Sequence, residues 1–253
     1  MARAKVDLRA LTRFPLIKAG DDLAAIVWRR LKAQKLGLEA GDVLVVAQKV
    51  VSKAEGRFVA LETVTPSPRA KMLAAQTDKD PRVVELILAE ARAVIRQRPG
   101  LLVVEHRLGF VLANAGIDSS NVGVEDTVLL LPEDPDASAA RLQARLAELS
   151  GVAPAIVIND SLGRAFRNGI VGTALGAIGL PALADLRGTP DLFGRPLQST
   201  EVGLADEIAS AGSLLQGEAG EGQPVVLVRG LDLAGRPSAG AALVRAGDRD
   251  LFR

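Results

Sequence analysis

The sequence predicts a mixed α+β fold, because helical and strand patterns alternate along its 253 residues without a strict strand–helix–strand order. Apolar residues recur at helical spacing in several segments, and short β-branched runs lie between them. A hydrophobic fraction of 48% is ordinary for a globular chain with a true core. Since no repeat, low-complexity tract or linker divides the chain, residues 1–253 are predicted to form a single domain.

The first helix and the first strand are predicted close to the N-terminus. Asp21 and Asp22 are typical helix N-caps, and the apolar residues that follow at helical spacing predict a helix to about Gln34. The pair Gly41-Asp42 indicates a turn, and the β-branched run at 43–47 predicts a strand directly after it.

The middle of the chain carries one predicted helix and two predicted strands. Asp80-Pro81 is an N-cap followed by a first-turn proline, and apolar residues continue at helical spacing over 84–95. Pro99-Gly100 is expected to end that helix. Residues 101–105 and 108–112 are then predicted to be neighbouring strands.

The second half of the chain begins with another Asp-Pro pair, Asp134-Pro135, which predicts a helix that Gly151 ends. Residues 155–158 predict a short apolar strand that finishes just before Asp160. Beyond it, the sequence predicts a helix at 200–215, a glycine-rich break at 217–222 and a last strand at 225–228.

Composition excludes several classes of function. Lys+Arg 31 against Asp+Glu 30 gives a net charge of +1, and aromatic residues make up only 3%, so no nucleic-acid partner is expected. The absence of cysteine excludes thiolate catalysis and cysteine metal sites, and the only histidine, His106, is expected to be structural. A metal would therefore be held by oxygen, which favours Mg²⁺ or Mn²⁺.

The N-terminus also indicates where the chain works. Its basic residues are not followed by an apolar segment of the secretory type, and no window is long and apolar enough to span a bilayer. The expected location is cytoplasmic, without a membrane partner.

Three acidic residues are candidates for a metal site. Asp118 and Asp160 follow predicted strands, and Glu218 lies in the glycine-rich segment after a predicted helix. Three such carboxylates can converge on one or two metal ions, although each is also typical of a turn or a cap. The chain has neither the glycine-lysine phosphate loop nor the dinucleotide glycine motif, so any nucleotide site must be built differently.

Basic residues lie close to the candidate acids in the sequence. Arg164 and Arg167 are expected in a loop after Asp160, where a guanidinium group could bind an anionic substrate or simply be solvated. Lys49 and Lys53 lie at the end of the predicted 43–47 strand, and a phosphate contact and a surface position remain equally open for them.

Six segments taken together resemble the coenzyme F-420-0:L-glutamate ligase family, the γ-glutamyl ligases of F-420 biosynthesis. They are FPLIKAGDDL at 14–23, GDVLVVAQKVVSKAEG at 41–56, NAGIDSSN at 114–121, LLLPEDPD at 129–136, DSLGR at 160–164 and Gly217-Glu218. The resemblance extends from about Phe14 to about Leu231, and the order of several long motifs makes it specific.

The resemblance implies a GTP-dependent ligase that adds L-glutamate to F-420-0 and then further glutamates through γ-linkages. It implies activation of a carboxylate as an acyl phosphate, which the amine of glutamate attacks. Mg²⁺ or Mn²⁺, with or without a monovalent cation, would assist. It also implies a homodimer of intertwined, two-lobed α+β subunits, and no C-terminal nitroreductase-like domain of the kind that some relatives carry is expected.

The resemblance also implies roles for individual residues. The metal ligands would be Asp118, Asp160, Ser161 and Glu218. The nucleotide contacts would be Phe14, Pro15, Leu16, Ile17, Gln48, Lys49, Lys53, Asn121, Gln216, Gly217, Gly220 and Gly222. The residues expected to act in catalysis are Asp118 and Asp160 and, from its place after Asp160 in the sequence, Arg164. Ser161 stands where the family often has threonine, and the hydroxyl ligand is retained.

Two other classes of function remain open from the residues. A metal-dependent phosphotransferase on an acidic metabolite would share the carboxylates but would turn over nucleotide without an amine acceptor. A non-catalytic module that binds a nucleotide or the deazaflavin would leave the nucleotide unchanged.

Overall fold

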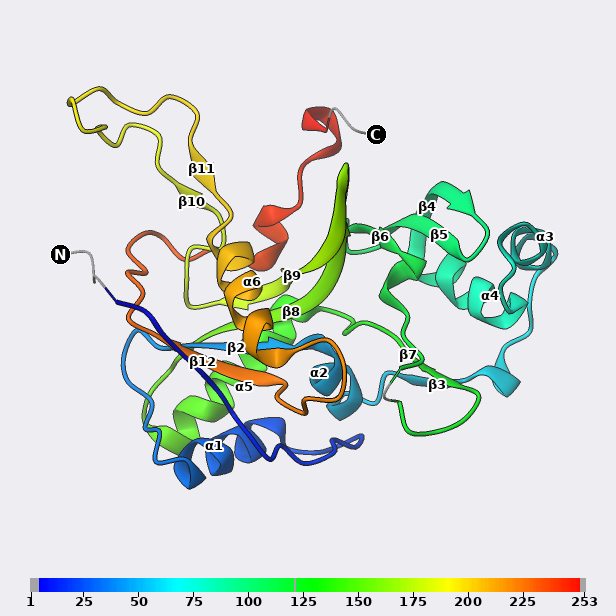
Figure 1. The fold of residues 1–253 in the computed structure, drawn as a ribbon, viewed down its shortest axis with the longest axis horizontal. Coiled ribbons are helices and arrows are strands. Elements are labelled where there is room, and N and C mark those ends of the chain that lie inside the picture. Colours follow the sequence, from blue (N-terminus) through cyan, green and yellow to red (C-terminus); the bar gives the residue numbers. More distant parts are fainter. Residues whose placement is uncertain (1–4, 121, 251–253) are drawn as a thin grey trace.

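The computed structural model describes residues 5–120 and 122–250, and it confirms the predicted α+β class. A five-stranded sheet forms the larger lobe (Figure 1). Its strands, in spatial order, are β1 (Asp7–Ala10), β12 (Val225–Arg229), β2 (Val43–Ala47), β8 (Ala155–Arg164) and β9 (Arg167–Ile178). Only β2 and β8 run parallel, and the other neighbours are antiparallel.

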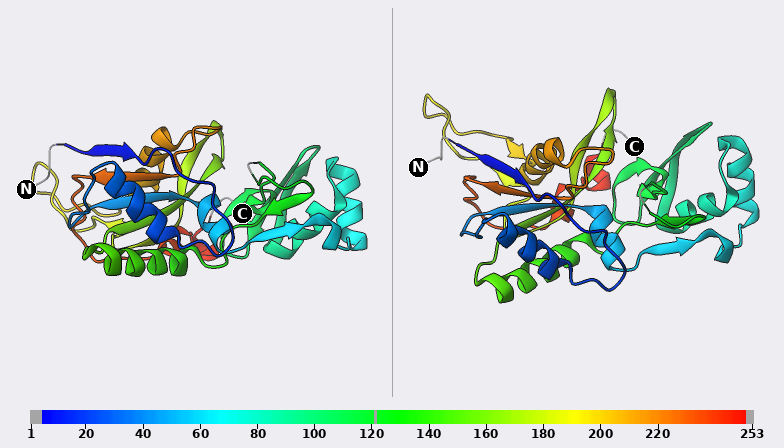
Figure 2. Two further views of the ribbon diagram at one scale, coloured as in Figure 1. Left: turned by 90° about the horizontal axis from the view of Figure 1, so that it is seen from below. Right: turned by 60° about the horizontal axis from the view of Figure 1, so that its bottom comes forward.

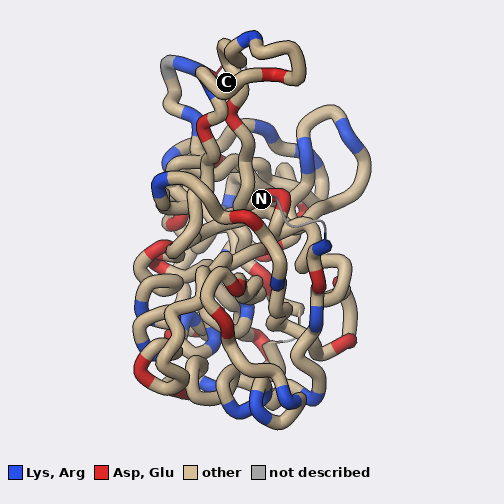
Figure 3. The backbone as a smooth tube through the Cα atoms, turned by 90° about the vertical axis from the view of Figure 1, so that its left-hand side faces the viewer, with Lys and Arg blue, Asp and Glu red and all other residues tan. Residues whose placement is uncertain are grey.

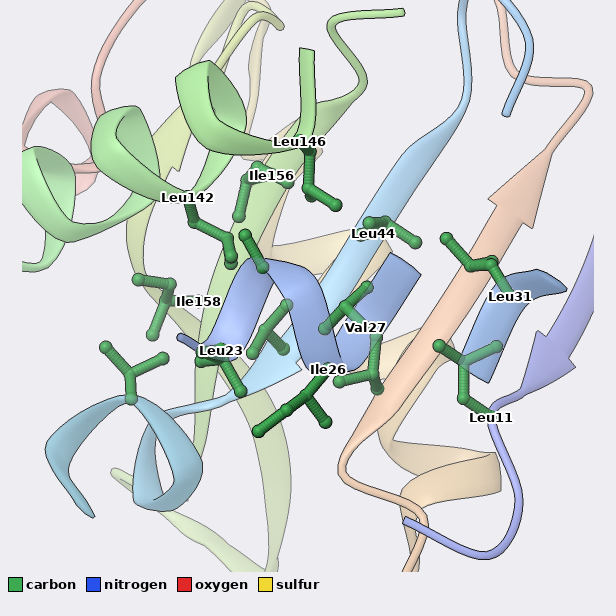
Figure 4. Close-up of a cluster of buried hydrophobic side chains, with 14 of the residues drawn as sticks. Leu11, Leu23, Ile26, Val27, Leu31, Leu44, Leu142, Leu146, Ile156 and Ile158 are labelled. Atoms are coloured by element: carbon green, nitrogen blue, oxygen red, sulfur yellow. The ribbon is translucent and has the colours of Figure 1, made fainter. Parts of the chain in front are cut away.

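Helices cover both faces of this sheet (Figure 2). Two of them, α1 (Leu23–Ala33) and α5 (Pro135–Ser150), share one face, and α6 (Leu204–Gln216) covers the other. The alternation of side chains along β8 explains this division. Ile156 and Ile158 are buried against α1 and α5, as Figure 4 shows, whereas Val157 is buried in the cluster that includes α6.

The predicted ends of α1 and α5 are confirmed. The carboxylates of Asp22 and Asp134 accept hydrogen bonds from backbone N–H groups in the first turns of α1 and α5. Gly151 ends α5 in the left-handed conformation, at a φ of 78°. These caps were readable from the sequence because they depend on contacts within four residues.

The smaller lobe is built from the middle of the chain (Figure 1). Its elements are β3 (Phe58–Ala60), α3 (Pro68–Thr77), α4 (Pro81–Glu90), β4 (Ala91–Arg98), β5 (Leu101–His106), β6 (Val111–Ala113) and β7 (Thr127–Leu129). Antiparallel strands β4, β5 and β6 form one sheet, and β3 pairs with β7. A separate apolar core, including Val84, Ile87 and Leu102, lies between α3, α4 and this sheet.

The prediction of one long helix over 81–98 was wrong in its second half. The helix ends at Glu90, and residues 91–98 form β4. Arg98 pairs directly with Leu101, so Pro99-Gly100 is the turn of a hairpin rather than a helix stop. The apolar spacing over 84–95 fits a helix or a strand, and pairing of residues 91–98 with β5 favours the strand.

Three further boundaries differ from the predictions. Strand β8 continues through Asp160 to Arg164, so the expected arginine loop is a tight β8–β9 hairpin. The last helix begins at Leu204, because Glu201–Val202 forms β11, which pairs with β10 (Ala184–Asp185). The second of the two strands expected after residue 100 begins only at Val111.

Several short elements were not predicted. Helix α2 (Gln48–Ala54) begins where β2 ends, and it sets Lys49 and Lys53 one turn apart on one face. The 3-10 helices are η1 (Leu61–Thr63), η2 (Asn114–Gly116), η3 (Gly240–Leu243) and η4 (Gly247–Arg249). Strands β1, β10 and β11 also escaped prediction, because each is four residues long or shorter.

Charges of both signs are interspersed along most of the chain in Figure 3. This distribution agrees with the near-balanced composition. Among the residues that the structure describes, no helix is long and apolar enough to cross a membrane.

A buried ionic cluster joins α4 to the strand that precedes β6. His106 is fully buried, its Nε2 lies 3.3 Å from Glu90 Oε2, and its Nδ1 accepts a hydrogen bond from the Leu108 N–H. Arg57 and Arg107 also pair with the Glu90 carboxylate. The contact with His106 and the two arginines outweighs burial and lowers the pKa of Glu90 to about 2.

We expect Glu90→Gln to destabilise the protein by about 2–3 kcal/mol at pH 7. Because the pKa of Glu90 is lowered on folding, its stabilisation is present above pH 4.5 and is lost as the pH falls toward 2. Urea unfolding of wild type and variant across this range checks the expectation: the difference in unfolding free energy should shrink as the pH falls. A constant difference, or a loss as large in the exposed control Glu62→Gln, would contradict it.

Candidate active site

A cavity of about 710 Å³ lies where the five-stranded sheet meets the smaller lobe. The register of the sheet explains its place. Ala47 of β2 pairs with Asn159 of β8, so the residues that follow each of them reach the same end of the sheet. The 216–224 segment, β6 and the residues after η2 complete the wall.

Strand β8 supplies three consecutive polar side chains, Asn159, Asp160 and Ser161, to the cavity. Asn159 faces α6 and bonds with Gln216, and Ser161 Oγ donates to Glu218 Oε1 at 2.7 Å. Asp160, between them, lies in the electrostatic field of Lys49 on α2, of Asp118 and of Glu218. Strand β8 therefore lies between the 216–224 loop and helix α2, which carries Lys49.

The Asp160 carboxylate has an unusual environment for an acid. Burial raises its pKa to about 6, and the negative charges of Asp118 and Glu218 act in the same direction. A backbone hydrogen bond from Ser161 and the charge of Lys49 compensate only in part. The carboxylates of Asp160, Asp118 and Glu218 together carry more charge than the Lys49 ammonium group that acts on Asp160, so a cation would be stabilised here.

Lys49 contacts an acidic residue and a serine of the smaller lobe. Its Nζ lies 2.5 Å from Asp118 Oδ2 and donates to Ser120 Oγ at 2.9 Å. Burial acts to raise the pKa of Asp118, but hydrogen bonds from Lys49 and Ser120 outweigh it and leave the pKa lowered. Burial and the neighbouring charge of Lys49 lower the pKa of Lys53. Two lysine charges on one helix face would be relieved by an anion.

Asp118 is held in place by the turn before it and by the strand opposite. Its backbone exchanges two hydrogen bonds with Leu129, at 3.1 and 2.8 Å. The preceding residues Asn114 and Ala115 both have positive φ angles, of 52° and 55°. Such angles are uncommon for residues other than glycine and often mark functional turns.

The glycine-rich loop after α6 has a defined conformation. Gly217 has φ 71° and ψ 175°, a region open essentially only to glycine. A Cβ on Gly217 would lie 2.2 Å from Cδ of Glu221. The Glu221 carboxylate in turn accepts a hydrogen bond from the Ala219 N–H. These constraints turn the loop so that Glu218 faces β8.

The structure places most of the predicted site residues around this one cavity. The lining residues among them are Phe14, Pro15, Leu16, Ile17, Gln48, Lys49, Lys53, Asp118, Asp160, Ser161, Gln216, Gly217, Glu218, Gly220 and Gly222. Ile17 and Gln48 are nearly fully buried, whereas Leu16 is 90% exposed. Their roles as ligand contacts stay predictions.

One predicted site residue that the structure describes does not lie among the lining residues. Arg164 is exposed at the tip of the β8–β9 hairpin, where it donates to the Asn168 carbonyl at 3.1 Å. Asn121 lies outside the described residues.

The donors present fit a hard cation. They are carboxylate and hydroxyl oxygens, and the only histidine lies buried in the smaller lobe. Among the described residues, no three acidic or histidine side chains are gathered closely enough to hold a metal ion by themselves. Mg²⁺ commonly binds through one or two carboxylates together with substrate phosphates, so Asp160, Glu218 and Ser161 match that pattern of ligation.

Sequence reasoning missed several residues of the wall. Asn159 is the main polar one, and its place directly before Asp160 at a strand end was the only signal for it. Leu112 and Ile117 reach the cavity from the smaller lobe, and Ile170 reaches it from β9. These apolar positions come from distant parts of the chain, so no local pattern marks them.

An α+β fold with one large cavity that combines carboxylates, lysines and apolar walls is the form of an enzyme acting on a small anionic molecule. The model of the F420-0:Gamma-glutamyl ligase family matches residues 12–230. The chain therefore belongs to this family and is a ligase.

Curated relatives match nearly the whole chain. A protein named Coenzyme F420:L-glutamate ligase from Methanopyrus kandleri is 48% identical over 94% of this chain and 93% of its own length. Proteins of the same name from Archaeoglobus fulgidus and Methanothermobacter thermautotrophicus are 45% and 43% identical, each over 98% of this chain. They cover 97% and 99% of their own lengths, respectively.

Proposed function

We propose that this protein is a GTP- and divalent-metal-dependent ligase that adds L-glutamate to coenzyme F-420-0 in F-420 biosynthesis, and then adds further glutamates through γ-linkages. The observation that carries the proposal is the cavity of about 710 Å³, in which Asp118, Asp160 and Glu218 lie with Lys49 in a chain of this ligase family.

The reaction requires transfer of one phosphoryl group. A carboxylate oxygen of F-420-0 attacks the γ-phosphorus of GTP, the bond to the β-phosphate oxygen breaks, and GDP leaves. The glutamate amine then attacks the acyl phosphate, loses a proton and expels inorganic phosphate, which leaves an amide. Such chemistry depends mostly on positioning and on neutralising charge.

The residues of the site divide this work. Lys49 and Lys53 would contact phosphate oxygens, because both ammonium groups lie on the cavity face of α2. Asp118, Asp160, Glu218 and Ser161 would hold the divalent ion, which would supply further neutralisation of phosphate charge. The apolar wall of Leu112, Ile117 and Ile170 suits a flat ring system.

The direct test is incubation of the purified protein with F-420-0, L-glutamate, GTP and Mg²⁺ or Mn²⁺, followed by mass spectrometry. We expect mass gains of whole glutamate residues, GDP in matching amounts, and no reaction when EDTA is present. Nucleotide turnover without glutamate would indicate a phosphotransferase instead. Unchanged nucleotide with folded protein would indicate a binding module, and undiminished ligation in EDTA would contradict the metal requirement.

A further inference from the structure

Two side-chain amides bridge β8 to the end of α6, beside the candidate active site. Asn159 Nδ2 donates to Gln216 Oε1 at 2.7 Å, and Gln216 Nε2 donates back to Asn159 Oδ1 at 3.1 Å. The pair is therefore reciprocal, with one donor and one acceptor used on each side. Asn159 is only 3% exposed, so water does not compete effectively for these bonds.

Each member of the pair is next to an acidic residue of the site. Asn159 directly precedes Asp160, and Gln216 lies two residues before Glu218. Gln216 Nε2 also donates to the Pro224 carbonyl at 3.2 Å, at the far end of the glycine-rich loop. The Gln216 amide therefore contacts both β8 and the far end of the 217–223 loop, where the Pro224 carbonyl also accepts a hydrogen bond from the Ala47 N–H at 2.8 Å.

The other link between β8 and this loop is weaker. Ser161 Oγ donates to Glu218 Oε1, but this contact is exposed to solvent. A single exposed hydrogen bond would not keep a loop with three glycines in one place, because glycine leaves the backbone free. The part-buried amide pair adds two hydrogen bonds that are less exposed to water than the Ser161 contact.

We propose that Asn159 is a positioning residue for the ligation reaction: through Gln216 it sets the separation of the Asp160 and Glu218 carboxylates across the cavity. This inference rests on the proposed function. Asn159 itself would act without contacting the reacting atoms. A displacement of about 1 Å at a site of this kind reduces the rate roughly 100-fold, so the pair has a measurable effect on turnover.

The expected result for Asn159→Ala is a fall in kcat of roughly 10- to 100-fold, with a smaller change in KM for F-420-0. Hydrogen exchange of the amides over 217–223 should become faster, because the loop loses its anchor. In a Gln216→Ala background, Asn159→Ala should cause little further loss of kcat, since the two residues act as a unit.

The chain offers a matched control for loss of a buried amide contact. Gln143 Nε2 donates to the Pro154 carbonyl at 2.9 Å, much as Gln216 donates to Pro224, but Gln143 lies on α5 and does not line the cavity. Gln143→Ala should therefore leave both kcat and the exchange of the 217–223 loop unchanged. If it reduced kcat as strongly as Asn159→Ala, a general loss of stability would explain both and the proposal would fail.

A swapped pair gives the most stringent test. The double variant Asn159→Gln with Gln216→Asn keeps both amides and their combined length. The double variant should recover at least part of the kcat that is lost in the single variants Asn159→Gln and Gln216→Asn. If Asn159 acted only through local packing, no such recovery would occur. No recovery, together with unchanged loop exchange in Asn159→Ala, would overturn the positioning role.

The outcome for the wild type separates this proposal from the proposed function. If wild-type protein adds no glutamate to F-420-0, the proposed function fails, whatever the variants do. If wild type is active and Asn159→Ala is equally active, only the positioning role fails.

Discussion

Asp160→Asn is expected to abolish ligation while making the metal-free protein more stable. Activity should fall by at least roughly 100-fold, because the substitution removes the charge that would hold a cation beside the transferred phosphate. Stability should rise, because burial and the neighbouring charges of Asp118 and Glu218 disfavour the ionised carboxylate. Loss of function with a gain of stability is typical of a charge kept for function.

The direction of the pH effect follows from the raised pKa. Asp160 titrates at about 6 in the folded protein against an ordinary value of 3.8, so the ionised group destabilises the fold as the pH rises through 6. At pH 7 the variant should be more stable by on the order of 2 kcal/mol, or roughly 4–8 °C in Tm measured with EDTA present. At pH 4 this difference should nearly vanish.

Asp206→Asn is the matched control for this experiment. Burial also raises the pKa of Asp206, and its carboxylate accepts a hydrogen bond from the Ala174 N–H, but the residue lies on α6 outside the cavity lining. An asparagine there can still accept that bond, so activity should be retained. Full activity in the Asp160→Asn variant would show that Asp160 is not a residue of the active site. A lower Tm in that variant would show that the fold stabilises the Asp160 charge.

The sequence was sufficient to predict the parts of the fold that depend on local contacts. The caps at Asp22, Asp134 and Gly151 act within a few residues, and the strand at 43–47 is apolar enough to be buried on both faces. The pattern at 84–95 was ambiguous, because pairing of β4 with β5 decides its conformation and that pairing is not local. The length of β8 depends in the same way on β9.

The candidate site residues could be chosen from the sequence because the acids and lysines lie in motifs that resemble one family, and the structure brings these candidates to one cavity. The contacts among them were not readable. Lys49 lies beside Asp118 only because α2 begins at the end of β2 and the 114–118 turn brings Asp118 across from the smaller lobe. Asn159 was overlooked because a strand-end asparagine has no specific meaning until its partner 57 residues away is known.

Lys49→Met is expected to lower both activity and stability, in contrast to Asp160→Asn. Methionine keeps the apolar stem of the side chain but removes the ammonium group that Asp118 and Ser120 contact. The half-buried Asp118 carboxylate then loses its ion-pair partner, which should cost about 1–3 kcal/mol. Without that charge facing the phosphates, kcat/KM for GTP should fall roughly 100-fold or more.

The measurement pairs steady-state kinetics with thermal unfolding, and Lys71→Met on the exposed face of α3 serves as the control. That variant removes the same charge at a position outside the cavity lining, so it should match wild type in both readouts.

Adding Asp118→Asn to Lys49→Met should restore most of the lost stability without restoring activity, because it removes the unpaired charge but not the need for a phosphate contact. Retained kcat/KM in Lys49→Met would place the phosphate contact elsewhere, and since Lys53 lies one turn away on the same helix, Lys53→Met would be the next variant to compare.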